Sequence, residues 1–234
     1  AAARTLYRED NMANDHDIAQ VSDIILPHLA SAPGERADAQ ADLAAALARR
    51  LTRGGLVGRA QRLIDAALGL DGITPLLRAA LIAAKGDRLL REGAAVSAED
   101  AWREALAIDP TQERAASALA ARLTDAGDPF AAIGLLMPCP GVLCRIEQAR
   151  AHLRGGAPKA ALAELDRVEP PSSCSGAEAG HDPETGPLLH LHRGRALVAL
   201  ARHSEAVRDL RFYFDRFPAF PRPAEERRLG RAAG

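Results

Sequence analysis

Two segments that lie about 100 residues apart carry the same residue types at the same intervals. In the first, Gly86 is followed by Ala98 and then by Pro110, at steps of 12 residues. In the second, positions 194, 206 and 218 are again glycine, alanine and proline. Apolar residues between these positions recur at three- and four-residue steps, which is the spacing of one helix face. Such a recurrence predicts stacked copies of one helical motif rather than a single unrepeated core.

Three further segments follow the same template, so the sequence predicts five helical hairpins. In each unit, two small positions let the helices approach closely. A glycine in the motifs REG, DAG and RGG ends the first helix, and a proline ends the second. The fit is loosest in the fourth unit, where Arg145 and Gln148 stand at positions expected to be apolar. The predicted units are 41–74, 79–112, 113–141, 142–175 and 187–220.

This pattern resembles the tetratricopeptide repeat (TPR) family, in which a large residue, Leu-Gly, two aromatic slots, alanine and proline recur over about 34 residues. The resemblance covers 41–220, although leucine or isoleucine fills most of the aromatic slots. It implies an all-α fold, a right-handed superhelical α-solenoid of five TPR-like hairpins with a concave binding face. Trp102 occupies the second aromatic slot, and we expect it to be a core residue between helices rather than part of a ligand site.

The ends of the chain and one internal stretch depart from the template. Residues 1–40 include DIAQVSDIILPHL, which predicts a helix interrupted near Pro27 and an N-terminal half-repeat. Residues 221–234 are short and charged, and we predict a C-terminal cap or tail there. An insertion rich in Pro, Gly and Ser at 171–187 predicts a loop. The chain begins AAARTL without methionine or a secretory signal, as expected of a mature or trimmed form.

The resemblance also implies which first-helix positions line the concave face. These positions hold seven arginines and three aspartates, in a chain of net charge −1. The predicted partner-binding residues are Arg49, Arg53, Arg91, Arg114, Arg150, Arg154 and Arg195. Because guanidinium groups bind carboxylates bidentately, a basic groove is predicted for an acidic or C-terminal-carboxylate segment of a protein. The alternative is that these arginines lie on solvated helix faces and pair with neighbouring acids. The family's Lys and Asn carboxylate clamp is not reproduced, so a reader of chaperone tails is not expected.

The three cysteines, Cys139, Cys144 and Cys174, flank predicted helices at one edge of the stack. Disulfides need Cα atoms within about 7 Å, which this arrangement allows for Cys139 with Cys144 or for Cys144 with Cys174. A bridge would indicate an oxidising compartment such as the periplasm. The alternative is three unpaired, partly buried thiols. Since no paired C-x₂-C is present, a zinc site is not expected.

The remaining chemistry in the sequence argues against catalysis. His190 and His203 fall in aromatic slots of the fifth unit and are expected to face one another, whereas His192 points elsewhere; we expect buried or half-buried histidines rather than a metal pair. The sequence contains no nucleophile elbow, phosphate loop, zinc-protease or dinucleotide motif, so no enzyme activity, metal or cofactor is expected. Near-neutral charge and few aromatics argue against nucleic acid, and no apolar run reaches the ~18 residues of a membrane span.

These features favour a non-catalytic protein–protein interaction scaffold or assembly factor that holds a partner in its groove, as a subunit of a bacterial envelope-associated complex. A bacterial source is indicated by basic residues that are almost all arginine, with Lys85 and Lys159 the only lysines. The periplasm is slightly favoured over the cytoplasm. The alternative is a regulatory or sensory TPR domain that binds a peptide or small ligand, which an enclosed pocket would favour. An enzyme ranks third and would need a cluster of convergent titratable groups.

Overall fold

The computed structural model describes residues 19–20, 22–27, 37–168 and 185–216. Within these ranges the protein is all-helical and contains no strand, which confirms the predicted all-α class. Several predictions fall outside the described residues: Cys174, the 221–234 cap, and most of the insertion and of the 1–40 segment.

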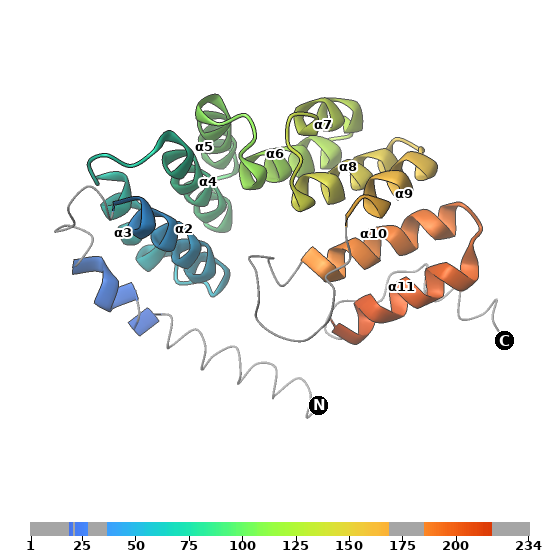
Figure 1. Ribbon diagram of the computed structural model, residues 1–234, viewed down its shortest axis with the longest axis horizontal. Helices are drawn as coiled ribbons and strands as arrows, with labels where there is room; N and C mark the ends of the chain where they lie inside the picture. The colour runs from blue at the N-terminus through green and yellow to red at the C-terminus, as the bar shows by residue number, and fades with distance from the viewer. Residues whose placement is uncertain (1–18, 21, 28–36, 169–184, 217–234) are drawn as a thin grey trace. The chain divides into compact units, whose positions relative to one another are not determined.

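Ten helices of the described ranges form five consecutive hairpins, drawn in Figure 1. Their bounds are α2 (Ala37–Arg53), α3 (Val57–Leu68), α4 (Pro75–Arg91), α5 (Ala95–Ile108), α6 (Glu113–Asp125), α7 (Pro129–Leu136), α8 (Val142–Arg154), α9 (Pro158–Asp166), α10 (Thr185–Ala199) and α11 (His203–Arg216). Residues 19–20 and 22–27 are also helical, and the residues that follow Pro27, where the predicted interruption would be tested, lie outside the described residues.

Three helices begin earlier than the repeat template predicts. The first helix of the first hairpin begins at Ala37 rather than 41, because Ala37 is itself buried against the core. In the second hairpin α4 begins at Pro75 rather than 79, since a proline suits the first position of a helix and the preceding Thr74 is extended. The last hairpin begins at Thr185, so residues 185–187 of the predicted insertion belong to α10.

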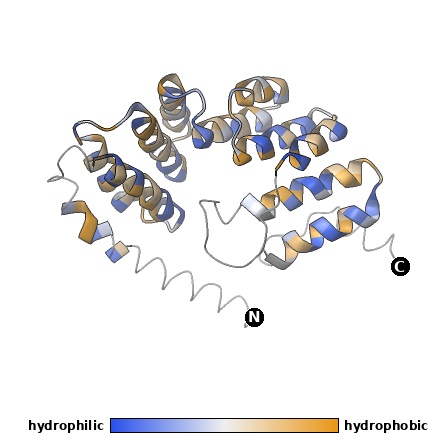
Figure 2. Cartoon of the chain, in the orientation of Figure 1, coloured by the Kyte–Doolittle hydropathy of each residue, from blue (hydrophilic) through white to orange (hydrophobic). Residues whose placement is uncertain are grey.

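The chain divides into two compact units, Ala1–Leu119 and Ala120–Gly234, and the boundary falls inside α6. In the first unit α2 packs on α3 and α4, and α4 packs on α3 and α5. In the second, α8 packs on α7, α9 and α10, and α10 packs on α9 and α11. Hydrophobic and hydrophilic residues alternate around these helices, as Figure 2 shows. Within each unit, a first helix therefore contacts both its own partner and the next first helix, which is how hairpin repeats share a core.

The five hairpins turn in the same way. The residue two positions after the first helix has positive φ in every hairpin: four are glycines (Gly55, Gly93, Gly127 and Gly156) and the fifth is Ala201, with φ 57°. Each turn carries the same pair of hydrogen bonds. In the second hairpin Ala94 N–H donates to the Leu89 carbonyl and Gly93 N–H to the Leu90 carbonyl, both at 3.0 Å. This Schellman arrangement satisfies the last carbonyls of the first helix, and it confirms that the REG, DAG and RGG glycines end their helices.

Small residues hold the paired helices close together. The second small positions are fully buried in all five hairpins: Ala60, Ala98, Ala132, Ala161 and Ala206. The first small position is an equally buried alanine in three hairpins (Ala48, Ala120 and Ala149) and a glycine in the other two. Trp102 is only 1% exposed, so it is a core residue between α4 and α5, as its place in the pattern predicts.

Candidate functional site

All seven predicted partner-binding arginines lie on the first helices of the hairpins. Three are exposed in the last turn of their helix: Arg53, Arg91 and Arg154. Four are half-buried along their helix: Arg49, Arg114, Arg150 and Arg195. The half-buried set is the better candidate for a binding site, because partial desolvation strengthens each charge–charge interaction.

In the first unit, Asp87 is the centre of a cluster built from four helices. Its side chain is only 10% exposed, and its Oδ2 accepts a hydrogen bond from Arg114 Nε at 2.7 Å. Its Oδ1 accepts from Trp102 Nε1 at 3.3 Å, so the indole that fills the core also has a polar partner. Burial raises the pKa of Asp87, while the charges of Arg114 and Arg49 and both hydrogen bonds oppose that shift.

Arg49 on α2 completes this cluster. Burial lowers the pKa of Arg49, and the nearby Arg114 and Arg53 charges act in the same direction, whereas Asp87 and Asp42 oppose them. Among the described residues, no side chain hydrogen-bonds the Arg49 guanidinium. Asp87 is already bonded to Arg114 and Trp102. Arg49 is therefore a half-buried cation whose donors remain available for an anionic ligand.

In the second unit, Arg150 on α8 is the corresponding basic residue, but it is paired. Its Nη2 donates to Asp125, and its Nη1 donates to Glu147 Oε2 at 3.1 Å. Burial lowers the pKa of Arg150, but the charges and hydrogen bonds of Glu147 and Asp125 outweigh that effect, so the pKa is raised. Arg150 is therefore held by protein carboxylates.

The two ion pairs follow one rule. Asp87 and Arg114 join α4 to α6, and Asp125 and Arg150 join α6 to α8, so each pair connects the first helices of successive hairpins. Arg114 and Arg150, two of the seven predicted partner-binding arginines, thus bind aspartates that the repeat pattern places on the same face. The face carries compensated charge at these points, and Arg49 differs because no described residue binds it.

His192 on α10 lies close enough to Arg150 and Arg195 to feel both charges. Its side chain is buried, and burial together with Arg195 and Arg150 lowers its pKa to about 3. Its Nδ1 has no hydrogen-bond partner among the described residues. At neutral pH this imidazole is therefore uncharged, so it adds no third positive charge beside the two arginines.

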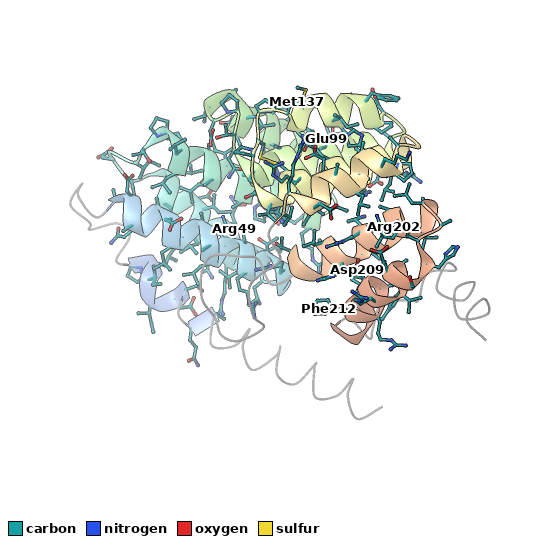
Figure 3. All side chains as sticks on the ribbon, turned by 45° about the vertical axis from the view of Figure 1, so that its right-hand side comes forward. Arg49, Glu99, Met137, Arg202, Asp209 and Phe212 are labelled. Carbon is teal, nitrogen blue, oxygen red and sulfur yellow. A yellow bond between two sulfur atoms is a disulfide. The ribbon has the colours of Figure 1, made fainter. Side chains whose placement is uncertain are left out.

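His190 has different neighbours from those expected. It binds Asp209 through Nδ1 at 2.8 Å, and its ring packs on Phe212 with centroids 4.2 Å apart. Both partners lie on α11, where Figure 3 labels them. His203 is exposed at the start of α11, so the prediction that His190 and His203 face one another is wrong. The reason is that the two helices run in opposite directions, which brings the first half of α10 against the second half of α11.

A disulfide joins Cys139 and Cys144, one of the two pairings that the sequence allowed, across a Cα–Cα distance of 6.1 Å. It closes the turn between α7 and α8, and both residues are buried. By loop-closure entropy a bridge over so short a segment stabilises the fold by about 2 kcal/mol.

Two surface features were missed at the level of sequence. The first is at α7 and its C-cap, where Phe130 and Met137 are 73% and 75% exposed; Met137 is labelled in Figure 3. A run of 16 residues without charge, 129–144, could have drawn attention to it. The second is an open pocket of about 410 Å³ in the second unit, lined by Lys159, Leu162, Ala163, Asp166, Leu200 and Arg202. No linear pattern marks this pocket, because it forms where a turn meets another helix.

Within the described ranges, no group of three or more His, Cys, Asp or Glu side chains is arranged to hold a metal ion. No helix there has the length and apolar character needed to cross a bilayer. No protein-family model matches the chain, and no curated protein matches its sequence.

Proposed function

We propose that this chain is a non-catalytic interaction module of the TPR type, an α-solenoid whose first-helix face binds an acidic segment of a partner protein. Its setting would be a bacterial envelope-associated complex in which it acts as a scaffold or assembly factor. The stacking of first helices within each unit and the five equivalent turns support the repeat architecture.

The observation that carries the proposed ligand class is Arg49. The Arg49 guanidinium is half-buried, and no described residue hydrogen-bonds it. It lies near two arginines and two aspartates, so this group of five charges carries a net positive charge. A carboxylate can accept two parallel hydrogen bonds from such a group. Asp87 holds Arg114 beside it through the 2.7 Å ion pair, so a second guanidinium is already oriented when the ligand arrives.

The ligand's acidic group would be a side-chain carboxylate of a peptide that runs across α2, α4 and α6. Asp87 keeps the cluster from being strongly basic, which favours a segment with spaced carboxylates over a polyanion. The exposed Arg53 at the end of α2 would meet a flanking acid at the rim. Rim charges mainly raise the association rate, whereas the desolvated Arg49 would supply the specific contact.

The test uses a fluorescein-labelled peptide of alternating Glu and Leu with an amidated C-terminus, titrated into the full chain at fixed ionic strength. Arg49→Gln removes the charge, and Arg103→Gln is the matched control, because Arg103 lies 56% exposed on α5 and pairs with Glu99 on the same helix. A charge-assisted hydrogen bond is worth about 1.5–3 kcal/mol, so Arg49→Gln should weaken binding by about 10-fold or more. Equal affinities for the two variants would contradict the proposal.

A sensory domain for a small ligand is the alternative function. It needs an enclosed site, since ligand pockets bury most of a small molecule's surface. The pocket between α9 and the α10–α11 turn opens broadly to solvent, which favours contact with a macromolecular partner.

A further inference from the structure

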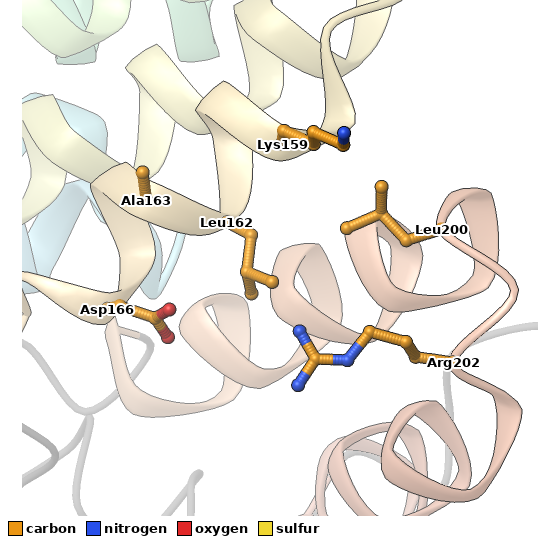
Figure 4. Close-up of a pocket in the computed structure, with 6 residues that line it drawn as sticks. All are labelled: Lys159, Leu162, Ala163, Asp166, Leu200 and Arg202. Carbon is orange, nitrogen blue, oxygen red and sulfur yellow. The ribbon is translucent and has the colours of Figure 1, made fainter.

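The pocket of the second unit lies where the α10–α11 turn meets α9 (Figure 4). Leu162 and Ala163 come from α9, and Leu200 and Arg202 come from the turn. The turn is fixed by its cap: Arg202 N–H donates to the Leu197 carbonyl at 2.9 Å, and Ala201 has positive φ. The pocket wall is therefore held in place by backbone hydrogen bonds.

The floor of the pocket is apolar. Leu162 is 8% exposed and belongs to the core of the second unit, and Leu200 packs against that same core. Two leucines at the base of a recess of about 410 Å³ favour an aliphatic or aromatic side chain. The volume is at the small end of ligand sites and suits one anchoring side chain better than an enclosed cofactor.

The rim carries two cations. Figure 4 shows Lys159 and Arg202 on opposite sides of the two leucines, with Asp166 at the edge. Among the described residues, nothing binds the Lys159 ammonium. Arg202 binds Glu205 through two 2.7 Å hydrogen bonds, but the two side chains are 47% and 44% exposed, so this pair is weak and exchangeable. Asp166 in turn interacts with Arg193 at 3.5 Å.

We propose that this pocket binds the C-terminal residue of a partner protein, with its apolar side chain on Leu162 and Leu200 and its terminal carboxylate between Lys159 and Arg202. A C-terminal residue carries both groups on one Cα, which matches a small apolar floor with cations at its edge. An internal Asp or Glu places its carboxylate on a different side chain from the apolar group. This site is separate from the Arg49 cluster and does not depend on it.

The test is a titration of the full chain with the fluorescein-labelled peptide Gly-Ser-Gly-Ser-Leu, compared with the same peptide amidated at its C-terminus. Loss of one exposed ion pair weakens binding by up to about fivefold, so the Lys159→Gln variant should bind more weakly by up to that factor. Arg202→Gln should have a similar effect. The amide loses the contacts to both cations, so it should bind more weakly still. Arg211→Gln, an exposed arginine on α11 that does not line the pocket, is the matched control and should leave affinity unchanged.

A second readout locates the peptide. Methyl resonances of Leu162 and Leu200 should shift saturably with the free-acid peptide, whereas those of Leu136 on α7 should not. Equal binding of acid and amide, binding without shifts at the two leucines, or no binding by the wild-type chain would each overturn the proposal. The proposal would also be overturned if an amidated Gly-Leu-Asp-Gly-Ser peptide bound as tightly as the Gly-Ser-Gly-Ser-Leu free acid. That result would show recognition of an internal carboxylate.

Discussion

Gly86 and Trp102 lie so close together that a Cβ on Gly86 would stand 2.4 Å from the indole Nε1. The same relationship recurs in the last hairpin, where a Cβ on Gly194 would stand 2.6 Å from Leu210 Cγ. In both cases 16 residues separate the glycine from the large side chain. Real Cβ contacts do not reach such distances, so glycine is what allows a large side chain to fill the space between the paired helices.

Gly86→Ala should destabilise the first unit by about 1–3 kcal/mol, because the overlap with a buried indole exceeds the roughly 1 kcal/mol gained from alanine's helix propensity. Trp102 is the only tryptophan, so its fluorescence during urea unfolding reports on this unit. Gly58→Ala in α3 is the control, since an added Cβ meets nothing within 4 Å there. That variant should be as stable as the parent or slightly more so, and equal stability of Gly86→Ala and Gly58→Ala would be inconsistent with the packing described.

Ala201→Gly should stabilise the second unit by about 0.5–1 kcal/mol. Its φ of 57° costs an L-residue about 1–2 kcal/mol, part of which is offset because glycine gains more freedom in the unfolded chain. Urea unfolding followed by circular dichroism measures the change. The reciprocal variant, Gly93→Ala in the equivalent turn with φ 85°, should lose stability. A loss in both variants would show that the Ala201 turn is not equivalent to the others.

The turns, the buried alanines and the place of Trp102 were predictable because each depends on a local pattern. A glycine that ends a helix or an alanine at a helix crossing is required by the backbone wherever the hairpin recurs. Contacts between hairpins were not predictable in the same way. The pairing of Asp87 with Arg114, or of His190 with Asp209, depends on side-chain directions and on the offset between neighbouring helices.

The candidate site was therefore predicted only as a set of positions. Counting along the repeat put Arg49, Asp87 and Arg114 on one face, and the structure brings these three together. Counting did not reveal that aspartates would hydrogen-bond Arg114 and Arg150, whereas no described carboxylate hydrogen-bonds Arg49. That distinction depends on which carboxylates of the neighbouring first helices each guanidinium can reach.

His192 should make stability depend on pH. Its folded-state pKa is about 3, below an unfolded value of about 6.5, so the folded state binds fewer protons in this range. The free energy of unfolding should therefore fall as pH is lowered from 6.5 towards 3, with a slope approaching about 1.4 kcal/mol per pH unit. His192→Leu should remove this contribution, whereas His203→Leu, at an exposed position, should keep it. Identical pH profiles for the two variants would rule out a buried neutral His192.

The disulfide between Cys139 and Cys144 predicts a thiol count. The chain has three cysteines, so the oxidised protein should show one reactive thiol under denaturing conditions and three after reduction. Replacing both bridge cysteines with serine should destabilise the second unit by about 2 kcal/mol. Three thiols before reduction, in protein purified without reductant from an oxidising compartment, would mean that the bridge does not form.

The most direct test of the central claim observes Arg49 itself. In a nitrogen–proton correlation spectrum of the full chain, the Arg49 Nε–Hε resonance should shift saturably as the amidated Glu-Leu peptide is added, and the Arg103 resonance should not move. Arg114, which Asp87 already holds, should shift less than Arg49. Peptide binding that leaves the Arg49 resonance in place, or that moves Arg49 and Arg103 alike, would contradict a specific carboxylate site on this face.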